Sequence, residues 1–218
     1  MNALLLFSVL SGALSLPLAS VQDTTTQCTN PCNGVESTNH PSSLCGNKFL
    51  GPAVFTAPSD PDWSDMFAGY DPLAQLCPTS FLKQWTTGSA YIYPPDDGAL
   101  LDSAQKPVIT EYTLQEGYEL DRFGSQYGGY LAPRGTPFAW RSIPPGNLNP
   151  HANSTQYNYW VWRVKVPFNV TGGPIAPWFG QPGFGLQFYY EAGLGELESQ
   201  GFIELVESRS CPCVAHDL

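Results

Sequence analysis

Charged side chains are scarce in this sequence, and positively charged ones are scarcest. Only 13% of the 218 residues are charged, and nine Lys and Arg stand against nineteen Asp and Glu, for a formal net charge of −10. So acidic a protein repels the phosphate backbone of nucleic acids, and we expect no nucleic-acid partner. Beyond the first 20 residues no long apolar run occurs, so we also expect no membrane span.

The signatures of several common enzyme classes are absent. There is no Gly-x-Ser-x-Gly elbow, and His40, His151 and His216 lie in turn-like or terminal stretches, which argues against a serine hydrolase. No P-loop is present, and the glycine-rich stretch 180–185 is not a dinucleotide fingerprint because no βαβ unit surrounds it. A cysteine nucleophile would need a free thiol, and all six cysteines are better explained as disulfides.

Glycine and proline, by contrast, are abundant, with 21 of each. Neither residue is comfortable in a helix interior, which excludes a coiled coil or a helical bundle. The 42% hydrophobic and 13% aromatic residues are enough to form a core, which argues against disorder. The composition therefore predicts one turn-rich domain, with room for an N-terminal extension.

The N-terminus indicates secretion. Residues 3–19 form an uncharged apolar run, and Ala19 and Ser20 are small residues at which a signal peptidase could cut, so we predict a signal peptide over residues 1–20. The even number of cysteines suits an oxidising compartment. Asn153 and Asn169 each begin a glycosylation sequon. We therefore expect a secreted or cell-surface glycoprotein.

The cysteines predict three disulfides, although sequence alone does not choose the pairing. They are Cys28, Cys32, Cys45, Cys77, Cys211 and Cys213. A bond between Cys211 and Cys213, which one proline separates, would be strained, so we expect at least one of them to reach back to the group within residues 28–77. A zinc site would need reduced thiolates in a secreted protein, and we predict no metal site.

The pattern of residues predicts short helices before residue 87 and short strands after residue 107. Asp60 before Pro61, and Thr79 before an apolar stretch, are candidate helix N-caps in the region 61–86. The predicted strands cover 108–114, 118–123, 156–166, 185–190 and 202–206. Residues 21–60 are expected to form a disulfide-stapled extension with no core element. The predicted division is an extension over 21–105 and a catalytic domain over 106–218.

The strand over 156–166 shows the clearest alternation. Its even-numbered residues include two tryptophans and two valines, so this face is predicted to be the buried one. These residues are Trp160, Trp162, Val164 and Val166.

The positive charges gather in one region. Arg122, Arg134 and Arg141 lie close together in sequence and beside the aromatic residues Phe123 and Phe138. A guanidinium presents a planar fork of donors that matches phosphate oxygens, and aromatic rings can stack on a flat heterocycle. This combination suits a dinucleotide. The residues support equally well a second interpretation, in which Asp121–Arg122 is an ion pair in a turn and Arg134 is simply exposed.

A second acidic constellation is Glu196-Leu197-Glu198. A pair of carboxylates serves glycosidases, which would make the protein an acidic secreted glycosidase. Because the pair follows Gly193-Leu194-Gly195, a solvated turn is the favoured interpretation.

Three motifs in the second half of the chain resemble the tuberculosis necrotizing toxin (TNT) domain, and more closely the secreted fungal NAD glycohydrolases that share it. They are Leu120-Asp121-Arg122-Phe123-Gly124, the stretch from Gly135 to Pro145, and the long run from Gly173 to Gln187. The resemblance implies an α+β, mainly β fold, with short twisted strands, long Pro/Gly loops, a few short helices and the disulfide-stapled extension. It also implies hydrolysis of NAD⁺ or NADP⁺ to nicotinamide and ADP-ribose or its phosphate.

The resemblance assigns roles to individual residues. Arg122 and Arg141 would grip the dinucleotide phosphates, with Arg141 counted among the catalytic residues, and Phe123 would pack against the ligand. Of the two candidate catalytic glutamines we prefer Gln187, which follows the glycine-rich loop on a predicted strand. The full set of expected substrate-binding residues is Arg122, Phe123, Thr136, Phe138 and Gln181.

The resemblance also concerns assembly and cofactors. It implies NAD(P)⁺ as the substrate and no required cofactor. Fungal relatives resemble homodimers with calcium near the C-terminus, but here the tail offers little beyond Asp217 and the terminal carboxylate, so the sequence does not support a calcium site. Phe184 stands at a loop position where the family favours glycine, and would narrow the pocket. The alternative to an enzyme is a catalytically silent secreted nucleotide-binding or cell-wall protein of the same fold.

Overall fold

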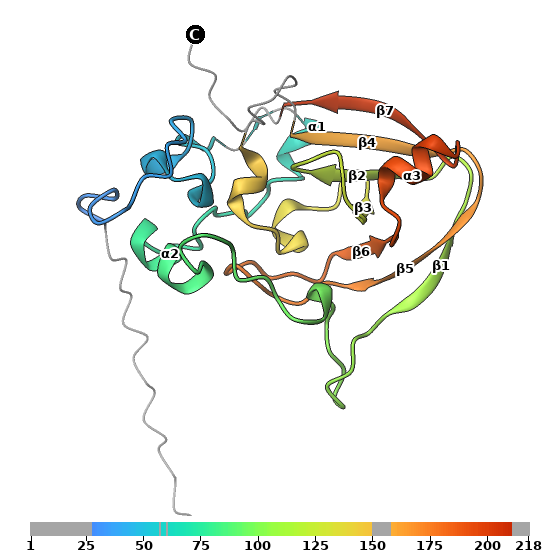
Figure 1. The fold of residues 1–218 in the computed structure, drawn as a ribbon, viewed down its shortest axis with the longest axis horizontal. Helices are drawn as coiled ribbons and strands as arrows, with labels where there is room; N and C mark the ends of the chain where they lie inside the picture. Colours follow the sequence, from blue (N-terminus) through green and yellow to red (C-terminus); the bar gives the residue numbers. More distant parts are fainter. Residues whose placement is uncertain (1–27, 57, 60, 150–157, 211–218) are drawn as a thin grey trace, which may run out of the picture.

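The protein is built around a seven-stranded antiparallel sheet with the strand order β1-β5-β6-β3-β2-β4-β7 (Figure 1). The computed structural model describes residues 28–56, 58–59, 61–149 and 158–210. The strands are β1 (Thr110–Leu114), β2 (Glu119–Phe123), β3 (Tyr130–Pro133), β4 (Tyr159–Val164), β5 (Phe168–Pro174), β6 (Leu186–Tyr189) and β7 (Ile203–Arg209). The predicted α+β, mainly β fold is confirmed.

Helices are few and short. The α-helices are α1 (Pro61–Ser64), α2 (Pro78–Trp85) and α3 (Leu194–Ser199). The 3₁₀ turns are η1 (Leu44–Gly46), η2 (Lys48–Leu50), η3 (Asp96–Gly98), η4 (Phe138–Arg141) and η5 (Pro145–Leu148). Every helix among the described residues is too short or too polar to cross a membrane.

Helix α2 begins earlier than the sequence predicts. Its N-cap is Cys77, in an extended conformation, and Pro78 occupies the first turn. Proline favours that position because its missing N–H would have no partner there, so the prediction of Thr79 as N-cap is wrong. The other predicted cap, Asp60, lies outside the described residues.

Strand β4 is buried on both faces apart from Arg163, and the prediction of one buried face is wrong. Trp160, Trp162 and Val164 enter a core cluster with Leu120 and other residues. On the opposite face Tyr159 and Val161 have exposed fractions of 1% and 0%. The N-terminal part of the chain covers this second face, because Trp63 and Phe67 pack with Tyr159 and Val161 in a separate core cluster.

Val166, which the alternation places on the buried face of the same strand, is 49% exposed. It lies beyond the end of β4, in a bend where the alternation of faces has stopped.

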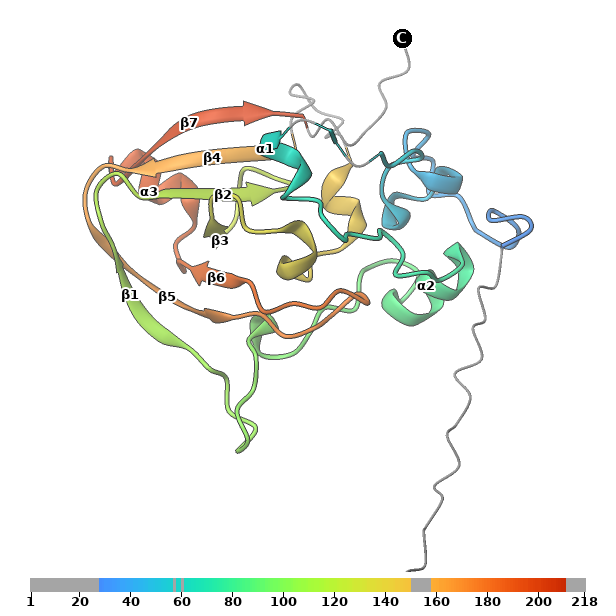
Figure 2. The ribbon, with the colours of Figure 1, turned by 180° about the vertical axis from the view of Figure 1, so that it is seen from behind.

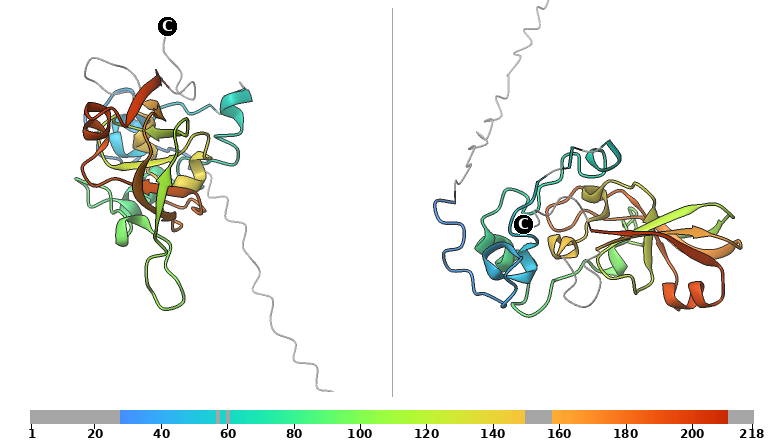
Figure 3. Two further views of the ribbon diagram at one scale, coloured as in Figure 1. Left: turned by 90° about the vertical axis from the view of Figure 1, so that its right-hand side faces the viewer. Right: turned by 90° about the horizontal axis from the view of Figure 1, so that it is seen from above.

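The segment predicted as an extension contributes to the core. Phe49 and Leu50 are 6% and 1% exposed, so the expectation that residues 21–60 hold no core element is wrong. Leu50 packs in a cluster with Phe81 and Phe179, the latter from the loop after β5. We call residues 28–52 and 73–92 the N-terminal lobe. It lies at one end of the sheet and α3 at the other (Figures 2 and 3).

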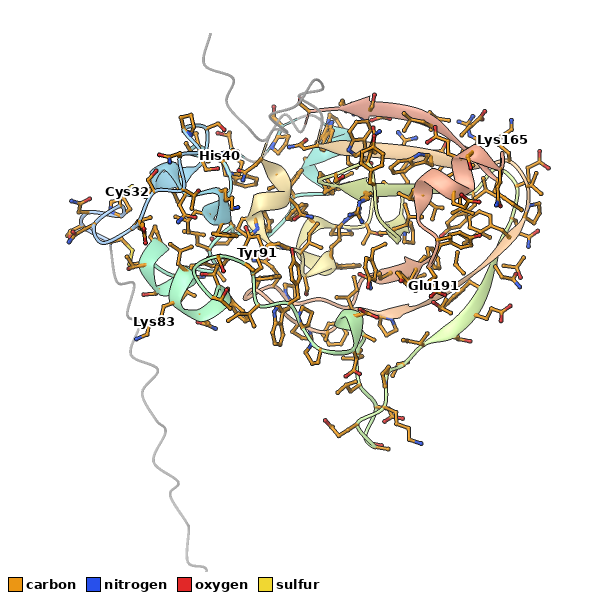
Figure 4. The ribbon with its side chains drawn as sticks, in the orientation of Figure 1. Cys32, His40, Lys83, Tyr91, Lys165 and Glu191 are labelled. Atoms are coloured by element: carbon orange, nitrogen blue, oxygen red, sulfur yellow. A yellow bond between two sulfur atoms is a disulfide. The ribbon has the colours of Figure 1, made fainter. Side chains whose placement is uncertain are left out.

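The predicted division at residue 105 does not separate two bodies. Isolated β-bridges join Ala99 to Ile175 and Leu101 to Pro107, and the amide of Leu100 donates to the carbonyl of Pro174 at 2.8 Å. Tyr91 also connects the lobe to the rest (Figure 4), since its hydroxyl donates to the carbonyl of Phe49 and accepts from the amide of Gly146.

Two disulfides staple the N-terminal lobe. Cys28 pairs with Cys77 and Cys32 with Cys45, at Cα–Cα separations of 5.8 and 5.2 Å. The four cysteines of this group therefore satisfy each other. The expectation that Cys211 or Cys213 reaches back to one of them is wrong, because none is left to receive it. Both C-terminal cysteines lie outside the described residues, as do the predicted signal peptide, Asn153 and Asp217.

Candidate functional site

A cavity of about 460 Å³ opens between the sheet and the segment that precedes β1. Its wall is formed by the segment 93–98, by strands β2, β3 and β6, by the stretch from the end of η4 into η5, and by the residue that follows β5. Its lining residues are Tyr93, Pro94, Asp97, Gly98, Arg122, Tyr130, Arg141, Ser142, Ile143, Pro144, Asn147, Ile175 and Gln187. Two smaller cavities of about 50 Å³ each share Tyr130 and Gln187 with it.

Arg122 brings an unpaired positive charge to the cavity. Its Nε donates to the carbonyl of Ser125 at 2.7 Å and its Nη1 to that of Tyr130 at 2.8 Å. No carboxylate of the described residues lies within ion-pair distance of it, and Nη2 has no hydrogen-bond acceptor among them. Burial lowers the pKa of Arg122, with opposing contributions from Tyr93 and Tyr130. The ion pair between Asp121 and Arg122 of the second interpretation is not formed, because Asp121 pairs with Arg141 instead.

Gly128 gives the Arg122 fork its room. Its φ is +121°, and a Cβ at this position would lie 3.0 Å from Nη2 of Arg122. A larger residue here would therefore be strained and would crowd the one guanidinium nitrogen that has no acceptor.

Arg141 reaches the same cavity but is already paired. Its Nη1 and Nη2 donate to the two carboxylate oxygens of Asp121 at 2.5 and 2.9 Å, and Nε donates to the carbonyl of Thr136 at 2.9 Å. Asp121 is fully buried, and it also accepts from the amide of Gly135 and the hydroxyl of Tyr159. Arg141 is therefore held in a rigid and largely neutralised arrangement.

The two candidate glutamines occupy different environments. Gln187, on β6, lines all three of these cavities, and its Nε2 donates to the backbone carbonyl of Asp97 at 3.1 Å. Gln181 is 5% exposed and lines none of the cavities found among the described residues. Its Nε2 donates to the carbonyl of Asp71 at 2.7 Å, and this bond connects the glycine-rich loop to the segment between α1 and α2.

The aromatic rings expected to stack on the ligand belong mainly to the core. Phe138 has no exposed surface and Phe123 has 2%, and the two rings meet at 4.9 Å in an edge-to-face contact. Phe123 lines one of the small cavities, whereas Phe138 lines none of the described ones. A stacking surface built from both rings is therefore not what the structure shows. Thr136 likewise acts through its carbonyl, which holds Arg141.

Three further residues lie outside the cavities of the described chain. Phe184 is 62% exposed and has a φ of +67°, which explains why glycine is favoured there, but it does not narrow the cavity. Glu196 and Glu198 are exposed on helix α3 rather than in the turn expected. Helix positions two apart point in different directions, so the two carboxylates do not face each other as a glycosidase pair would.

The cavity residues that the sequence analysis gave no role include Tyr93, Asp97, Tyr130 and Ser142. Tyr93 is 61% exposed and its ring packs against those of Tyr91 and Phe179. The stretch Tyr93-Pro94-Pro95-Asp96-Asp97-Gly98 carries a strong turn signal after an aromatic residue, which is the only pattern that could have drawn attention to it.

Ser142 combines two unusual features. Its φ is +46°, a strained value for a residue other than glycine, and its buried hydroxyl has no partner among the described residues. Strain and an unsatisfied polar group are typical of functional positions rather than of core packing.

No group of three or more His, Cys, Asp or Glu residues that could hold a metal ion occurs in the part of the chain that the structure describes. The cavity instead offers guanidinium, amide, carboxylate and phenol groups, which suit an organic anion with an attached ring.

Comparison with known proteins places the chain in a family. A family model described as tuberculosis necrotizing toxin matches residues 113–206. A conidial surface nicotinamide adenine dinucleotide glycohydrolase of Aspergillus fumigatus is 39% identical over 213 residues, covering 94% of this chain and 90% of the relative. The solved structure of tuberculosis necrotizing toxin with its immunity factor covers 81% of this chain and 87% of its own at 18% identity and a TM-score of 0.45. By its sequence, the chain belongs to the tuberculosis necrotizing toxin family.

Proposed function

We propose that this protein is an NAD⁺ glycohydrolase, which cleaves NAD⁺, and NADP⁺ as well, at the bond between nicotinamide and ribose. The family and the name of the Aspergillus relative support this proposal. The observation that carries it is the pairing, in one cavity, of an arginine without a carboxylate partner and a glutamine with a fixed amide.

Arg122 is the proposed phosphate-binding group. A diphosphate presents several anionic oxygens, and a partly buried guanidinium with an unused Nη2 can donate to one or two of them. The cost of desolvating this cation is offset only when an anion binds, which favours the liganded state. Arg141, although paired with Asp121 and Thr136, would add the second N–H of its Nη1 from the wall of the same cavity.

Gln187 is the proposed catalytic residue. Because its Nε2 donates to Asp97, its Oε1 is free to accept a hydrogen bond from a ribose hydroxyl or from the attacking water. The bond between C1′ of the ribose and N1 of nicotinamide breaks, and its electron pair neutralises the pyridinium nitrogen. Water adds to C1′ and releases one proton, giving ADP-ribose and neutral nicotinamide. The leaving group needs no protonation, so the site can work without a general acid.

Turnover is the direct test. Purified protein incubated with NAD⁺ or NADP⁺ should release equal amounts of nicotinamide and ADP-ribose or its phosphate, followed by chromatography. Gln187→Ala should lose nearly all activity while keeping its fold by circular dichroism. Gln115→Ala is the matched control, because Gln115 is exposed and lines no described cavity, and it should retain full activity. Saturable binding without turnover in the unmutated protein would instead support a silent nucleotide-binding relative.

Arg122 gives a second, graded test. Arg122→Ala should lower kcat/KM for NAD⁺ by about ten- to a hundredfold, since a hydrogen bond to a charged group contributes about 1.5–3 kcal/mol. Arg134→Ala is the matched control, because Arg134 is exposed and binds Glu119 and Glu207 instead. Equal loss in both variants would contradict a role for Arg122 in phosphate binding.

We further propose that the protein is secreted after removal of residues 1–20, glycosylated at Asn153 and Asn169, and homodimeric. Asn169 is exposed on β5, which suits an attached glycan. The disulfides of the N-terminal lobe suit an oxidising compartment. The mass of the secreted protein before and after enzymatic deglycosylation, and its size by light scattering, test these points.

A further inference from the structure

We propose that the carboxylate of Asp97 faces the cationic nicotinamide end of the substrate and so sets the direction in which the dinucleotide lies in the cavity. This inference rests on the proposed function. It assigns a substrate-facing role to a residue that lies outside the matched region 113–206.

The position of Asp97 supports this role. It lines the main cavity together with Gln187, and its backbone carbonyl accepts the hydrogen bond that fixes the Gln187 amide. Burial, together with the nearby Asp97 carboxylate, raises the pKa of Tyr130, another lining residue. The two oxygens of a carboxylate are strong acceptors, and together they hold a full negative charge. The negative charge therefore lies beside the glutamine proposed to act at the ribose.

The segment that holds Asp97 is anchored from both sides. The amide of Gly98 donates to the carbonyl of Pro95 at 3.0 Å, and the carbonyl of Gly98 accepts from the amide of Ala176 at 2.8 Å. Asp97 is therefore fixed against the strand region that also carries the cavity wall.

The charges of the cavity are complementary to those of NAD⁺. Among the described residues that line the main cavity, Asp97 is the only carboxylate, and neither it nor Arg122 belongs to an ion pair. NAD⁺ has an anionic diphosphate at its centre and a positive charge on the nicotinamide ring. With the diphosphate at Arg122, attraction to Asp97 favours the orientation that brings the nicotinamide ribose to Gln187.

The same carboxylate would act on the reaction. As the bond to nicotinamide breaks, positive charge moves from the ring to the ribose, where a nearby fixed anion stabilises it. Asp97 would then help the transition state as well as the bound substrate.

NADH provides a sharp test, because it has the same diphosphate and a neutral nicotinamide ring. Dissociation constants for NAD⁺ and NADH are measured by calorimetry in the full chain carrying Gln187→Ala, which prevents turnover. With Asp97 intact, NAD⁺ should bind more tightly than NADH. Adding Asp97→Asn should weaken NAD⁺ binding by about three- to tenfold and leave NADH binding nearly unchanged.

The substitution is conservative for the backbone. Asp97 has a φ of +53°, and asparagine tolerates this left-handed region well, so Asp97→Asn removes the charge and keeps the size of the side chain. Asp96→Asn is the matched control. Asp96 has a φ of +50°, is exposed, and lines only the small cavity on the other side of Gln187.

The outcomes separate this inference from the proposed function. An unchanged ratio of the NAD⁺ and NADH constants in Asp97→Asn, or an equal change in Asp96→Asn, would overturn the role of Asp97 while turnover by the unmutated protein still stood. Absence of turnover in the unmutated protein would overturn the proposed function itself.

A second readout uses NADH as an inhibitor of turnover in protein that keeps Gln187. The inhibition constant of NADH should be nearly the same in the unmutated protein and in Asp97→Asn, whereas kcat/KM for NAD⁺ should be lower in Asp97→Asn. A parallel loss of NADH inhibition and of kcat/KM would mean that the substitution damages the whole cavity, and would overturn a role specific to the cationic ring.

Discussion

At the scale of single residues, two arginines of one cavity have opposite electrostatic situations. Arg141 is 4% exposed and paired with Asp121 through both Nη1 and Nη2, whereas Arg122 has no carboxylate partner among the described residues. A buried ion pair stays stable only while both partners are present, because either charge alone would be left desolvated. Arg141 therefore has a structural role in this buried pair, whereas Arg122 has a charge available for a ligand.

We expect the Asp121–Arg141 pair to contribute strongly to the free energy of unfolding. Asp121→Ala should lower the free energy of unfolding by about 3–5 kcal/mol, since it leaves Arg141 buried and unpaired and removes acceptors from Gly135 and Tyr159. Urea denaturation followed by fluorescence measures this loss. Glu204→Ala, which breaks only exposed ion pairs with Arg163 and Lys165, should cost under about 1 kcal/mol. Similar losses in the two variants would contradict the interpretation.

At the scale of elements, the outer face of strands β2, β4 and β7 carries a network of charges. Glu119 on β2 accepts hydrogen bonds from Arg134 at 2.6 Å and from Arg163 at 2.8 Å. These bonds hold the pKa of Glu119 below its ordinary value of 4.5. A carboxyl group whose pKa is lowered on folding stabilises the folded state above its unfolded pKa and loses this effect as the pH falls.

The pH dependence of this network can be measured. Glu119→Gln should lower the free energy of unfolding by about 1 kcal/mol at pH 7, because its partners are partly exposed and screened. The difference from the unmutated protein should shrink as the pH falls below 4.5, through the pKa of the folded state. Denaturation curves at several pH values test this, and a difference that persists at low pH would mean that the contribution is not electrostatic.

The elements also show what the sequence could predict. The alternating residues of β2, β4 and β7 identified strands at nearly the right positions. Strands β3 and β5 were missed, because a glycine pair and terminal prolines obscure their pattern. Gly173 of β5 is required by the fold, since a Cβ there would lie 1.9 Å from the carbonyl oxygen of Val108. Such an approach between distant segments leaves no trace in local periodicity.

Only part of the candidate site could be predicted, because the rest depends on contacts between segments that are distant in sequence. Arg122, Arg141 and Gln187 were found through motifs, and the structure places all three in one cavity. Asp97 was missed because its contribution depends on a contact with β6, and Tyr93 because its ring packs against Phe179 of a distant loop, and only the fold creates these contacts. The buried position of Phe138 was also not evident, because the residues that cover it come from the N-terminal segment.

At the scale of the whole molecule, the two disulfides are nested. The bond Cys28–Cys77 closes a separation of 49 residues and encloses Cys32–Cys45, which closes 13. Chain entropy predicts that the longer loop contributes more stability, about 4 kcal/mol against about 3 kcal/mol. Removing Cys28 and Cys77 together should therefore lower the melting temperature more than removing Cys32 and Cys45, as calorimetry would show. The opposite order would mean that native packing, rather than loop length, determines their contributions.

The wall of the cavity draws on two stretches of the chain with different relations to the family. Arg122 and Gln187 lie within the region that the family model matches, whereas Tyr93 and Asp97 come before it. Two groups of cavity residues that are encoded in separate stretches of the chain can change independently in evolution. Relatives that keep Arg122 and Gln187 can thus acquire new ligand preferences through changes in the preceding segment alone. A comparison confined to residues 113–206 would not reveal such a change.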